Sequence, residues 1–223
     1  MQVLAVVANT DDETIGMGGT ISRHSAAGDN VFCLAMTDGI GARGMAEDNA
    51  AGARDTAAQE AAEILGFDWL HNPLLPDNAL DSVPLLQLIK VIETAASRIN
   101  PDIIYTHSTA DLNIDHTLVA RAVLTAFRPQ PAATWQEIRT FETASATDYG
   151  HPDVTGRFEP NLFVNIFDSW ERKRRALQAY SEEMRPAPHS RSLSGLEYLA
   201  CARGHQVGLA YAEAFLTIRK IAR

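Results

Sequence analysis

The stretch VVANTDDETIGMGGTI (Val6–Ile21) lies close to the start of the chain and joins an apolar run to a helix-like segment. The run itself, Val3–Ala8, is typical of a strand that is covered on both faces of a sheet. Three acids, Asp11, Asp12 and Glu13, gather where the strand ends. Acids cap the first turn of a helix, but one or two suffice, and adjacent negative charges repel one another. The cluster is therefore either a capped helix start or part of a site for a divalent cation.

The strand-like and helix-like patterns alternate through the first half of the chain. Buried strands are predicted at Asn30–Met36 and Asp102–Thr106, and helices follow each of them, the second over His116–Ala126. The second half is less regular, with strand-like EIRTFET, NLFVNI and AEAFLTIR. The alternation predicts an α/β fold of Rossmann-like type, with a mostly parallel sheet flanked by helices, in a single domain over residues 1–223.

Composition narrows the class of protein. The chain has 223 residues, a formal net charge of −9 and no apolar run long enough to cross a membrane. The acidic balance argues against nucleic-acid binding, and the basic ERKRRAL segment is interpreted as a solvated helix face. The N-terminus lacks the features of a signal peptide, and two cysteines do not form a disulfide framework. We therefore expect a cytoplasmic protein that does not bind nucleic acids, and the apolar segments allow a homo-oligomer.

Ligands of open α/β sheets bind beyond the carboxyl ends of the strands. Two polar loops leave such ends: NTDDE follows the first strand, and HSTADLNIDH follows Asp102–Thr106. His116 alone is more typical of a hydrogen-bonded structural histidine, but Asp115 beside it could tune a ligand or a catalytic imidazole. If both strands are central, the two loops face each other, and we expect the functional site there.

These motifs resemble the PIG-L/LmbE-like zinc-dependent de-N-acetylases. That family has a strand followed by Ala-His-Pro-Asp-Asp-Glu and a glycine-containing helix, and ANTDDETIGMGG (Ala8–Gly19) is similar to it. A second family motif, a loop ending in Asp-His, is matched by DLNIDH (Asp111–His116). The resemblance continues through ARDTAAQEAAEILG, KRRALQAYSEEMRPAPHSRS and ARGHQVGLAYAEAFLTIR, and so covers nearly the whole chain. It implies a hydrolase that removes an N-acetyl group from an amino sugar or a glycosylated small molecule.

The resemblance also implies roles for individual residues. The family's three metal-ligand positions correspond to Asn9, Asp12 and His116, with Zn²⁺ as the cofactor. Asp11 corresponds to the general base that activates the attacking water, and such a carboxylate can carry the proton to the leaving amine. Zinc with three protein ligands and an open position suits amide hydrolysis.

Four further positions have roles implied by the same resemblance. Asp115 would orient or tune its neighbours, and Asn113 stands where many members carry a histidine that stabilises the oxyanion. An asparagine amide can donate a hydrogen bond there, but it cannot act as a cationic acid. Arg54 and His189 correspond to substrate-contact positions.

Asn9 is the main departure from the family pattern, because the family has a zinc-binding imidazole at this position. A carboxamide oxygen is a weak, hard donor for zinc. Thr10 replaces the family's proline, which would only stiffen the turn. Three interpretations remain: a replaced histidine, a natural site that uses a harder divalent cation or a water, and a protein that binds sugars or nucleotide-sugars without catalysis.

The segment GIGARG (Gly39–Gly44) gives a competing prediction, since it fits the dinucleotide-binding fingerprint G-x-G-x-x-G. The fingerprint expects these glycines in the first strand–helix unit, whereas here they follow the second strand. A glycine-rich lid near the site is the preferred interpretation. Nicotinamide-cofactor binding would distinguish a dinucleotide-binding protein from a deacetylase.

Overall fold

The computed structural model describes residues 1–37, 39 and 50–222 of the chain. The predicted lid, Gly39–Gly44, therefore lies outside the described residues except for Gly39. Within them the strands are β1 (Gln2–Val7), β2 (Asn30–Ala35), β3 (Asp68–Trp69), β4 (Ile103–His107), β5 (Glu137–Phe141), β6 (Leu162–Asn165) and β7 (Ala212–Lys220). The helices are α1 (Asp12–Ala26), α2 (Ala50–Leu65), α3 (Leu85–Ile99), α4 (Ile114–Ala126), α5 (Pro152–Thr155), α6 (Trp170–Ala179) and α7 (Leu193–His205), with short 3-10 turns at Leu80–Ser82 and Phe167–Ser169.

The strands form one mostly parallel sheet in the order β3-β2-β1-β4-β5-β7-β6. The first five strands in this order are parallel, and β7 runs antiparallel to both β5 and β6. The chain reverses its direction of winding between β1 and β4, which is the switch point where ligands of such sheets bind. The predicted Rossmann-like α/β class is confirmed, and β1 and β4 are central strands.

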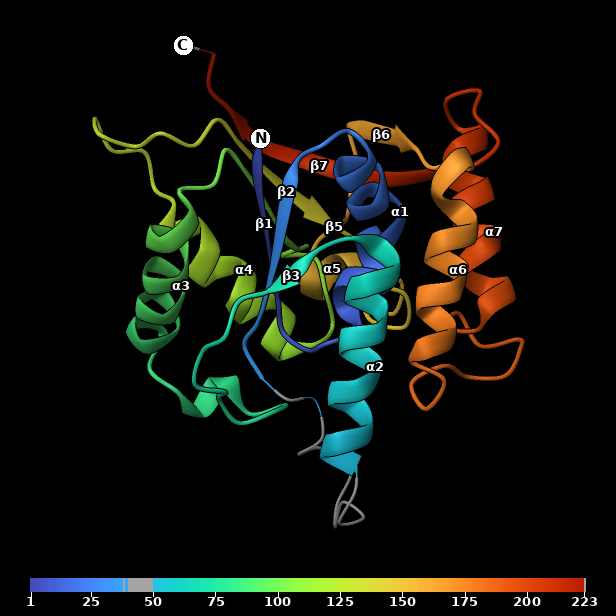
Figure 1. The fold of residues 1–223 in the computed structure, drawn as a ribbon, viewed down its shortest axis with the longest axis horizontal. Helices are drawn as coiled ribbons and strands as arrows, with labels where there is room; N and C mark the ends of the chain where they lie inside the picture. The colour runs from blue at the N-terminus through green and yellow to red at the C-terminus, as the bar shows by residue number, and fades with distance from the viewer. Residues whose placement is uncertain (38, 40–49, 223) are drawn as a thin grey trace.

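Helices cover both faces of the sheet (Figure 1). Side chains alternate along β1, so Val3, Ala5 and Val7 pack toward α1, α2 and α6. Leu4 and Val6 pack on the opposite face, toward α3 and α4. All of these side chains are fully buried, as expected for a strand that reads as a continuous apolar run.

Helix α1 enters the fold immediately after β1 and is kinked at Met17, whose backbone is not helical. The backbone amides of Gly19 and Thr20 lie just after the kink. Both amides donate to the carboxylate of Glu213 on β7, at 2.9 and 2.7 Å. Lys173 of α6 donates to the same carboxylate at 2.6 Å. This buried network fixes α1, and therefore its first turn, against the sheet and α6.

The sequence patterns outside the site also have counterparts in the structure. The predicted strands of the second half are β5, β6 and β7, and Gly66 follows α2 with a φ of 82°. Cys33 and Cys201 form no disulfide. Among the described helices, none has the length and apolar character needed to cross a membrane.

Candidate functional site

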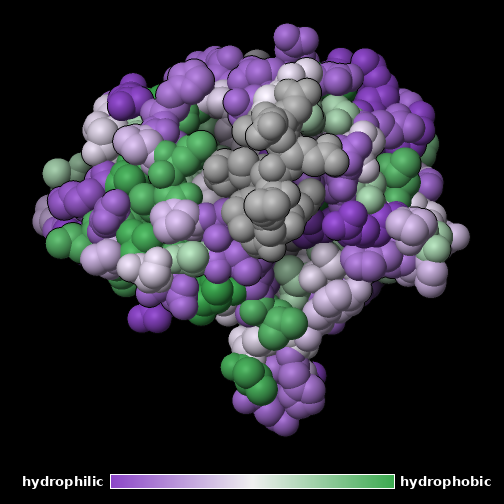
Figure 2. Space-filling view, turned by 90° about the horizontal axis from the view of Figure 1, so that it is seen from below, coloured by the Kyte–Doolittle hydropathy of each residue, from purple (hydrophilic) through white to green (hydrophobic). Residues whose placement is uncertain are grey.

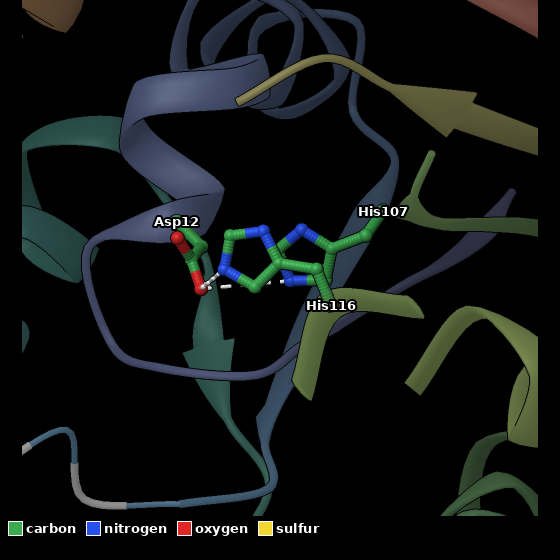
Figure 3. A group of neighbouring side chains, drawn as sticks. All are labelled: Asp12, His107 and His116. Atoms are coloured by element: carbon green, nitrogen blue, oxygen red, sulfur yellow. Dashed lines mark ion pairs between the residues drawn. The ribbon is translucent and has the colours of Figure 1, made fainter. Parts of the chain in front are cut away.

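The carboxyl ends of β1 and β4 bring three metal-ligating side chains together (Figure 3). Asp12 begins α1, His107 is the last residue of β4, and His116 lies in the first turn of α4. Oδ2 of Asp12 is 3.5 Å from Nε2 of His107 and 3.5 Å from Nε2 of His116. The three ligand atoms lie within 4.8 Å of one another, and all three residues are at most 1% exposed.

These separations suit a shared tetrahedral ion. Two atoms that bind one such ion at about 2.0–2.1 Å lie about 3.4 Å apart. Both distances from Asp12 Oδ2 are 3.5 Å. Two imidazoles and one carboxylate are also a donor set that zinc uses when it keeps a fourth position open. The residues present therefore fit a divalent cation of this kind.

The two histidine rings are stacked, with centroids 3.9 Å apart and an angle of 13° between their planes. Burial, together with the neighbouring His116, holds the pKa of His107 well below its ordinary value, so this ring is neutral. Burial also lowers the pKa of His116, but the charges of Asp12 and Asp111 outweigh it and raise that pKa. His116 is thus the member of the pair that holds a proton more readily.

Asp111 supports His116 from behind. Its Oδ2 lies 3.2 Å from Nδ1 of His116 and accepts a hydrogen bond from the Thr147 hydroxyl at 2.7 Å. Carboxylates beside the outer nitrogen of a ligating histidine fix the ring and raise its basicity. The sequence pointed to Asp115 for this role, whereas the structure places Asp111 at that nitrogen.

Asp11 is buried beside this cluster and adopts an unusual backbone conformation, with a φ of 117°. Two arginines contact its carboxylate: Arg54 Nη2 lies 3.2 Å from Oδ1, and Arg191 Nη1 lies 3.3 Å from Oδ2. Burial and the charge of Asp12 nevertheless raise the pKa of Asp11 to about 7, against the opposing effect of both arginines. A carboxyl with this pKa can accept and release a proton near neutral pH.

The guanidinium of Arg54 donates hydrogen bonds to groups around Asp11. Its Nε donates to the Thr10 hydroxyl at 2.9 Å, its Nη1 pairs with Glu183 at 2.5 Å, and its Nη2 donates to the Thr10 carbonyl. It is 8% exposed. Arg54 therefore holds the turn between β1 and α1, and its predicted contact with substrate remains a prediction.

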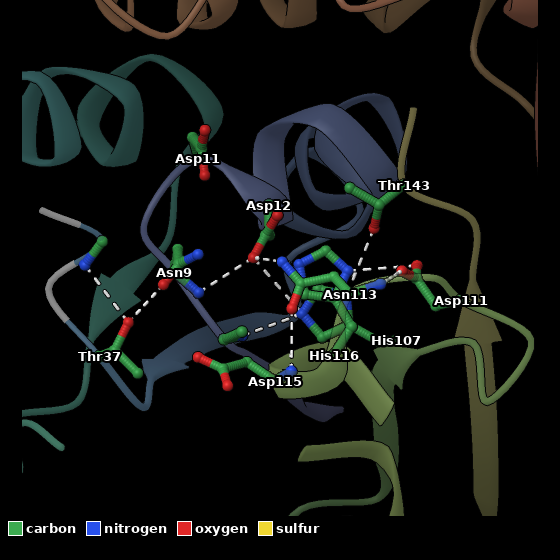
Figure 4. A network of polar contacts seen from close by, with 12 residues as sticks. Asn9, Asp11, Asp12, Thr37, His107, Asp111, Asn113, Asp115, His116 and Thr143 are labelled. Atoms are coloured by element: carbon green, nitrogen blue, oxygen red, sulfur yellow. Dashed lines mark hydrogen bonds and ion pairs between the residues drawn. The ribbon is translucent and has the colours of Figure 1, made fainter. Parts of the chain in front are cut away.

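The other predicted site residues surround the same cluster (Figure 4). The Asn9 carboxamide oxygen accepts a hydrogen bond from the Thr37 hydroxyl, and the backbone amide of Asn9 donates to Asp12 Oδ2 at 2.9 Å. Asn113 caps α4, because its Oδ1 accepts from the Asp115 amide at 2.9 Å. Asp115 accepts from the Leu80 amide at 3.0 Å, and burial raises its pKa.

His189 is connected to the site through Arg191, two positions later in the sequence. Its Nδ1 accepts from the Arg191 amide at 3.0 Å, and its ring lies edge-on to Tyr149, with centroids 6.2 Å apart. Arg191 in turn contacts Asp11 and donates from Nε to the Ser145 hydroxyl at 3.1 Å. The segment after α6 thus forms one wall beside Asp11.

The comparison with protein families shows the family to which the chain belongs. The chain matches the PIG-L family, described as GlcNAc-PI de-N-acetylase, over residues 4–127, more than half of its length. The chain belongs to the PIG-L family. The matched region contains most of β1 and all of α1, β4 and α4, and hence all three members of the cluster.

Solved structures share the fold of this PIG-L protein across nearly the whole chain. An N,N'-diacetylchitobiose deacetylase from Pyrococcus horikoshii is 23% identical, with a TM-score of 0.75 and coverage of 97% of this chain and 83% of the other. The zinc-inhibited form of a teicoplanin deacetylase is 15% identical, with a TM-score of 0.76 and 99% coverage of both chains. A 4-carboxy-2-hydroxymuconate hydratase from Pseudomonas putida KT2440 is 22% identical, with a TM-score of 0.70 and coverage of 100% and 98%.

The structure brings to the candidate site two residues that the motifs did not indicate. His107 stands one position beyond the predicted strand Asp102–Thr106, and Arg191 lies in the segment that supplied His189. The available signal for His107 was its place as a histidine at the carboxyl end of a buried strand. Arg191 gave no local signal, because its partner Asp11 is 180 positions away in the sequence. Figure 2 shows the face at which β1 and β4 end, with hydrophobic side chains at the left of the view and again below its centre.

Proposed function

We propose that this chain is a metal-dependent de-N-acetylase that hydrolyses the N-acetyl group of an amino sugar or a glycosylated small molecule. One observation carries the proposal. A buried group of metal-ligating side chains, Asp12, His107 and His116, lies beside Asp11, a carboxyl with a pKa of about 7. Membership of the PIG-L family supports the reaction, and the deacetylases that share the fold support the substrate class.

The reaction adds water to the acyl carbon, breaks the C–N bond and yields acetate and a free amine. A divalent cation, when bound, supplies Lewis-acid polarisation of the scissile carbonyl. Asp11 removes a proton from the attacking water and delivers it to the leaving nitrogen. Arg54 and Arg191 hold the Asp11 carboxylate from two sides, so that it stays in place while it gains and loses the proton.

The remaining residues surround the acyl group in this proposal. Asn113 uses its Oδ1 to cap α4, which leaves its amide nitrogen to donate to the developing oxyanion. Asp115 supports this turn from the side of Leu80. His189 and its neighbour Tyr149 form the wall against which the sugar would pack.

Zinc is the cation that we propose, because imidazole nitrogens with one carboxylate oxygen match its preferences. The cytoplasm is the compartment that we propose, because the unpaired cysteines Cys33 and Cys201 suit reducing conditions.

The test is acetate release from purified protein with one equivalent of zinc. The substrates are N-acetylglucosamine, N,N'-diacetylchitobiose and an N-acetylglucosaminyl glycoside, and both acetate and free amine are quantified. We expect equal amounts of the two products from at least one of these compounds, and no product after chelation. Binding of an acetylated sugar without turnover would instead establish the sugar-binding alternative.

A further inference from the structure

We infer that His107 supplies the imidazole that the PIG-L motif normally places at position 9, so that one metal ligand has moved from the end of β1 to the end of β4. The inference rests on the proposed metal-dependent function. It goes further because it assigns His107 as a metal ligand. It also explains how the chain keeps three metal-binding side chains although the motif has asparagine at position 9.

The register of the sheet makes this exchange feasible. β1 and β4 are parallel neighbours, with Val6 opposite Thr106. His107 is therefore level with the last residues of β1, just before Asn9. Nε2 of His107 lies 2.9 Å from the Ala8 amide nitrogen, so the imidazole reaches across to the chain at the motif position.

Asn9, by contrast, makes hydrogen bonds to other residues. Its carboxamide oxygen accepts the Thr37 hydroxyl, which ties the end of β1 to the chain that follows β2. Its backbone amide donates to Asp12 and fixes that carboxylate. A carboxamide oxygen is also a poor donor for zinc compared with an imidazole. Asn9 is thus a residue that orients Asp12, and His107 is the stronger candidate ligand.

The hydrogen bonds of His107 select the tautomer that a ligand needs. Nε2 accepts a hydrogen bond from the Ala8 amide, so this nitrogen carries a lone pair and no proton, and it lies 3.5 Å from Asp12 Oδ2. Nδ1 lies 3.3 Å from the Thr143 hydroxyl, which accepts its proton. A metal ion and the Ala8 amide compete for the one lone pair on Nε2. Loading the metal should therefore release the Ala8 amide, which is an observable separate from activity.

A purely structural role for His107 is the rival explanation. In that case its imidazole only satisfies the last amide of β1, and metal affinity should not depend on it. His107→Gln separates the two explanations, because the glutamine carbonyl can accept the Ala8 amide but is a weak zinc donor.

The experiment compares zinc affinity, by competition with a chromophoric chelator, for the parent chain, His107→Gln, Asn9→His and Asn9→His/His107→Gln. We expect His107→Gln to weaken binding by more than about 100-fold, since loss of outer partners alone costs 10–100-fold. The double variant should regain most of that affinity, because it returns an imidazole to the motif position. His24→Gln is the control: it removes another largely buried histidine, which pairs with Asp29 and Tyr105 away from the cluster, and should leave affinity unchanged.

Two results would overturn the inference in distinguishable ways. If His107→Gln binds zinc as tightly as the parent while Asp12→Asn loses it, His107 is structural and the metal-dependent function stands. If neither the parent nor Asn9→His binds a divalent cation, the proposed function fails together with the inference.

A measurement on the parent chain covers the case in which His107→Gln does not fold. Titration of zinc into protein labelled with ¹⁵N should shift the ring nitrogen signals of both His107 and His116, and the amide signal of Ala8. A shift of His116 alone would contradict the inference.

Discussion

At the scale of single residues, Asp11 combines a strained backbone with a heavily restrained side chain. Its φ of 117° is uncommon for a residue with a side chain, and such conformations persist only where surrounding contacts enforce them. Arg54 and Arg191 supply those contacts. The conformation separates the Asp11 carboxylate from that of Asp12, so the two adjacent acids can serve different functions.

Asp11→Asn is the first prediction at this scale. Asparagine tolerates positive φ, and it keeps the shape of the side chain while removing the base. We expect kcat to fall by about 10²–10⁴-fold, the usual contribution of a positioned general base. Bound zinc, measured in the same preparation, should remain stoichiometric. Unchanged turnover would remove Asp11 from the mechanism.

The pH dependence of activity follows from the raised pKa of Asp11, about 7. A base works only when it is unprotonated, so kcat/KM should rise with pH through the pKa that Asp11 has in the metal-loaded protein and level off above it. A cation on Asp12 offsets the negative charge that contributes to the raised value, so the rise should lie at lower pH in metal-loaded protein. The measurement is kcat/KM from about pH 5 to about pH 8. A profile that is flat over this range would contradict the assignment.

At the scale of elements, the start of α1 is placed by close packing on β5. A Cβ on Gly16 would lie 2.2 Å from a ring carbon of Phe141, so only glycine lets the helix approach the strand this closely. Asp12 is one turn before Gly16, and its position therefore depends on that contact.

Gly16→Ala should consequently lower the free energy of unfolding by about 1–3 kcal/mol through overpacking. It should also weaken zinc binding, because Asp12 must move. Gly18→Ala is the matched control in the same helix, since its Cβ would lie 3.3 Å from its nearest neighbour, Lys173 Cγ, and not 2.2 Å as at Gly16. Chemical unfolding and zinc titration of both variants test this, and equal effects of the two substitutions would contradict it.

At the scale of the whole molecule, α1, α6 and β7 meet in a buried ionic network. Glu213 accepts hydrogen bonds from the Gly19 and Thr20 amides, and it pairs with Lys173, which also donates to the Ile15 carbonyl at 2.8 Å. Lys173 and Glu213 are almost fully buried. The network ties the C-terminal strand to the helix that begins at the site.

Glu213→Gln leaves the Lys173 charge buried without its counterion, which should cost about 3–5 kcal/mol of stability. Glu93→Gln is the control, because it breaks the exposed pair with Lys90 and should cost about 0–1 kcal/mol. Urea unfolding of both variants provides the comparison. A loss for Glu213→Gln no larger than that for Glu93→Gln would show that the network contributes nothing.

The sequence by itself determined the class of fold and the place of the site. Continuous apolar runs such as Val3–Ala8 are local signals of buried parallel strands, and polar loops at their carboxyl ends mark the ligand-binding edge. The family motifs add Asp12 and His116, which the structure brings to within 3.5 Å of each other. These features are encoded within short segments, so no knowledge of packing was needed to find them.

The tertiary structure alone decided the membership of the site. His107 joins it because the register of β4 against β1 aims one strand-end side chain at the next strand, and a one-residue shift would turn that side chain to the other face. Arg191 joins it because the C-terminal elements fold back against α1, which brings together residues 180 positions apart. Asp111, and not Asp115, has its carboxylate 3.2 Å from His116 Nδ1. Side-chain direction and long-range packing are properties of the folded chain, and no local pattern encodes them.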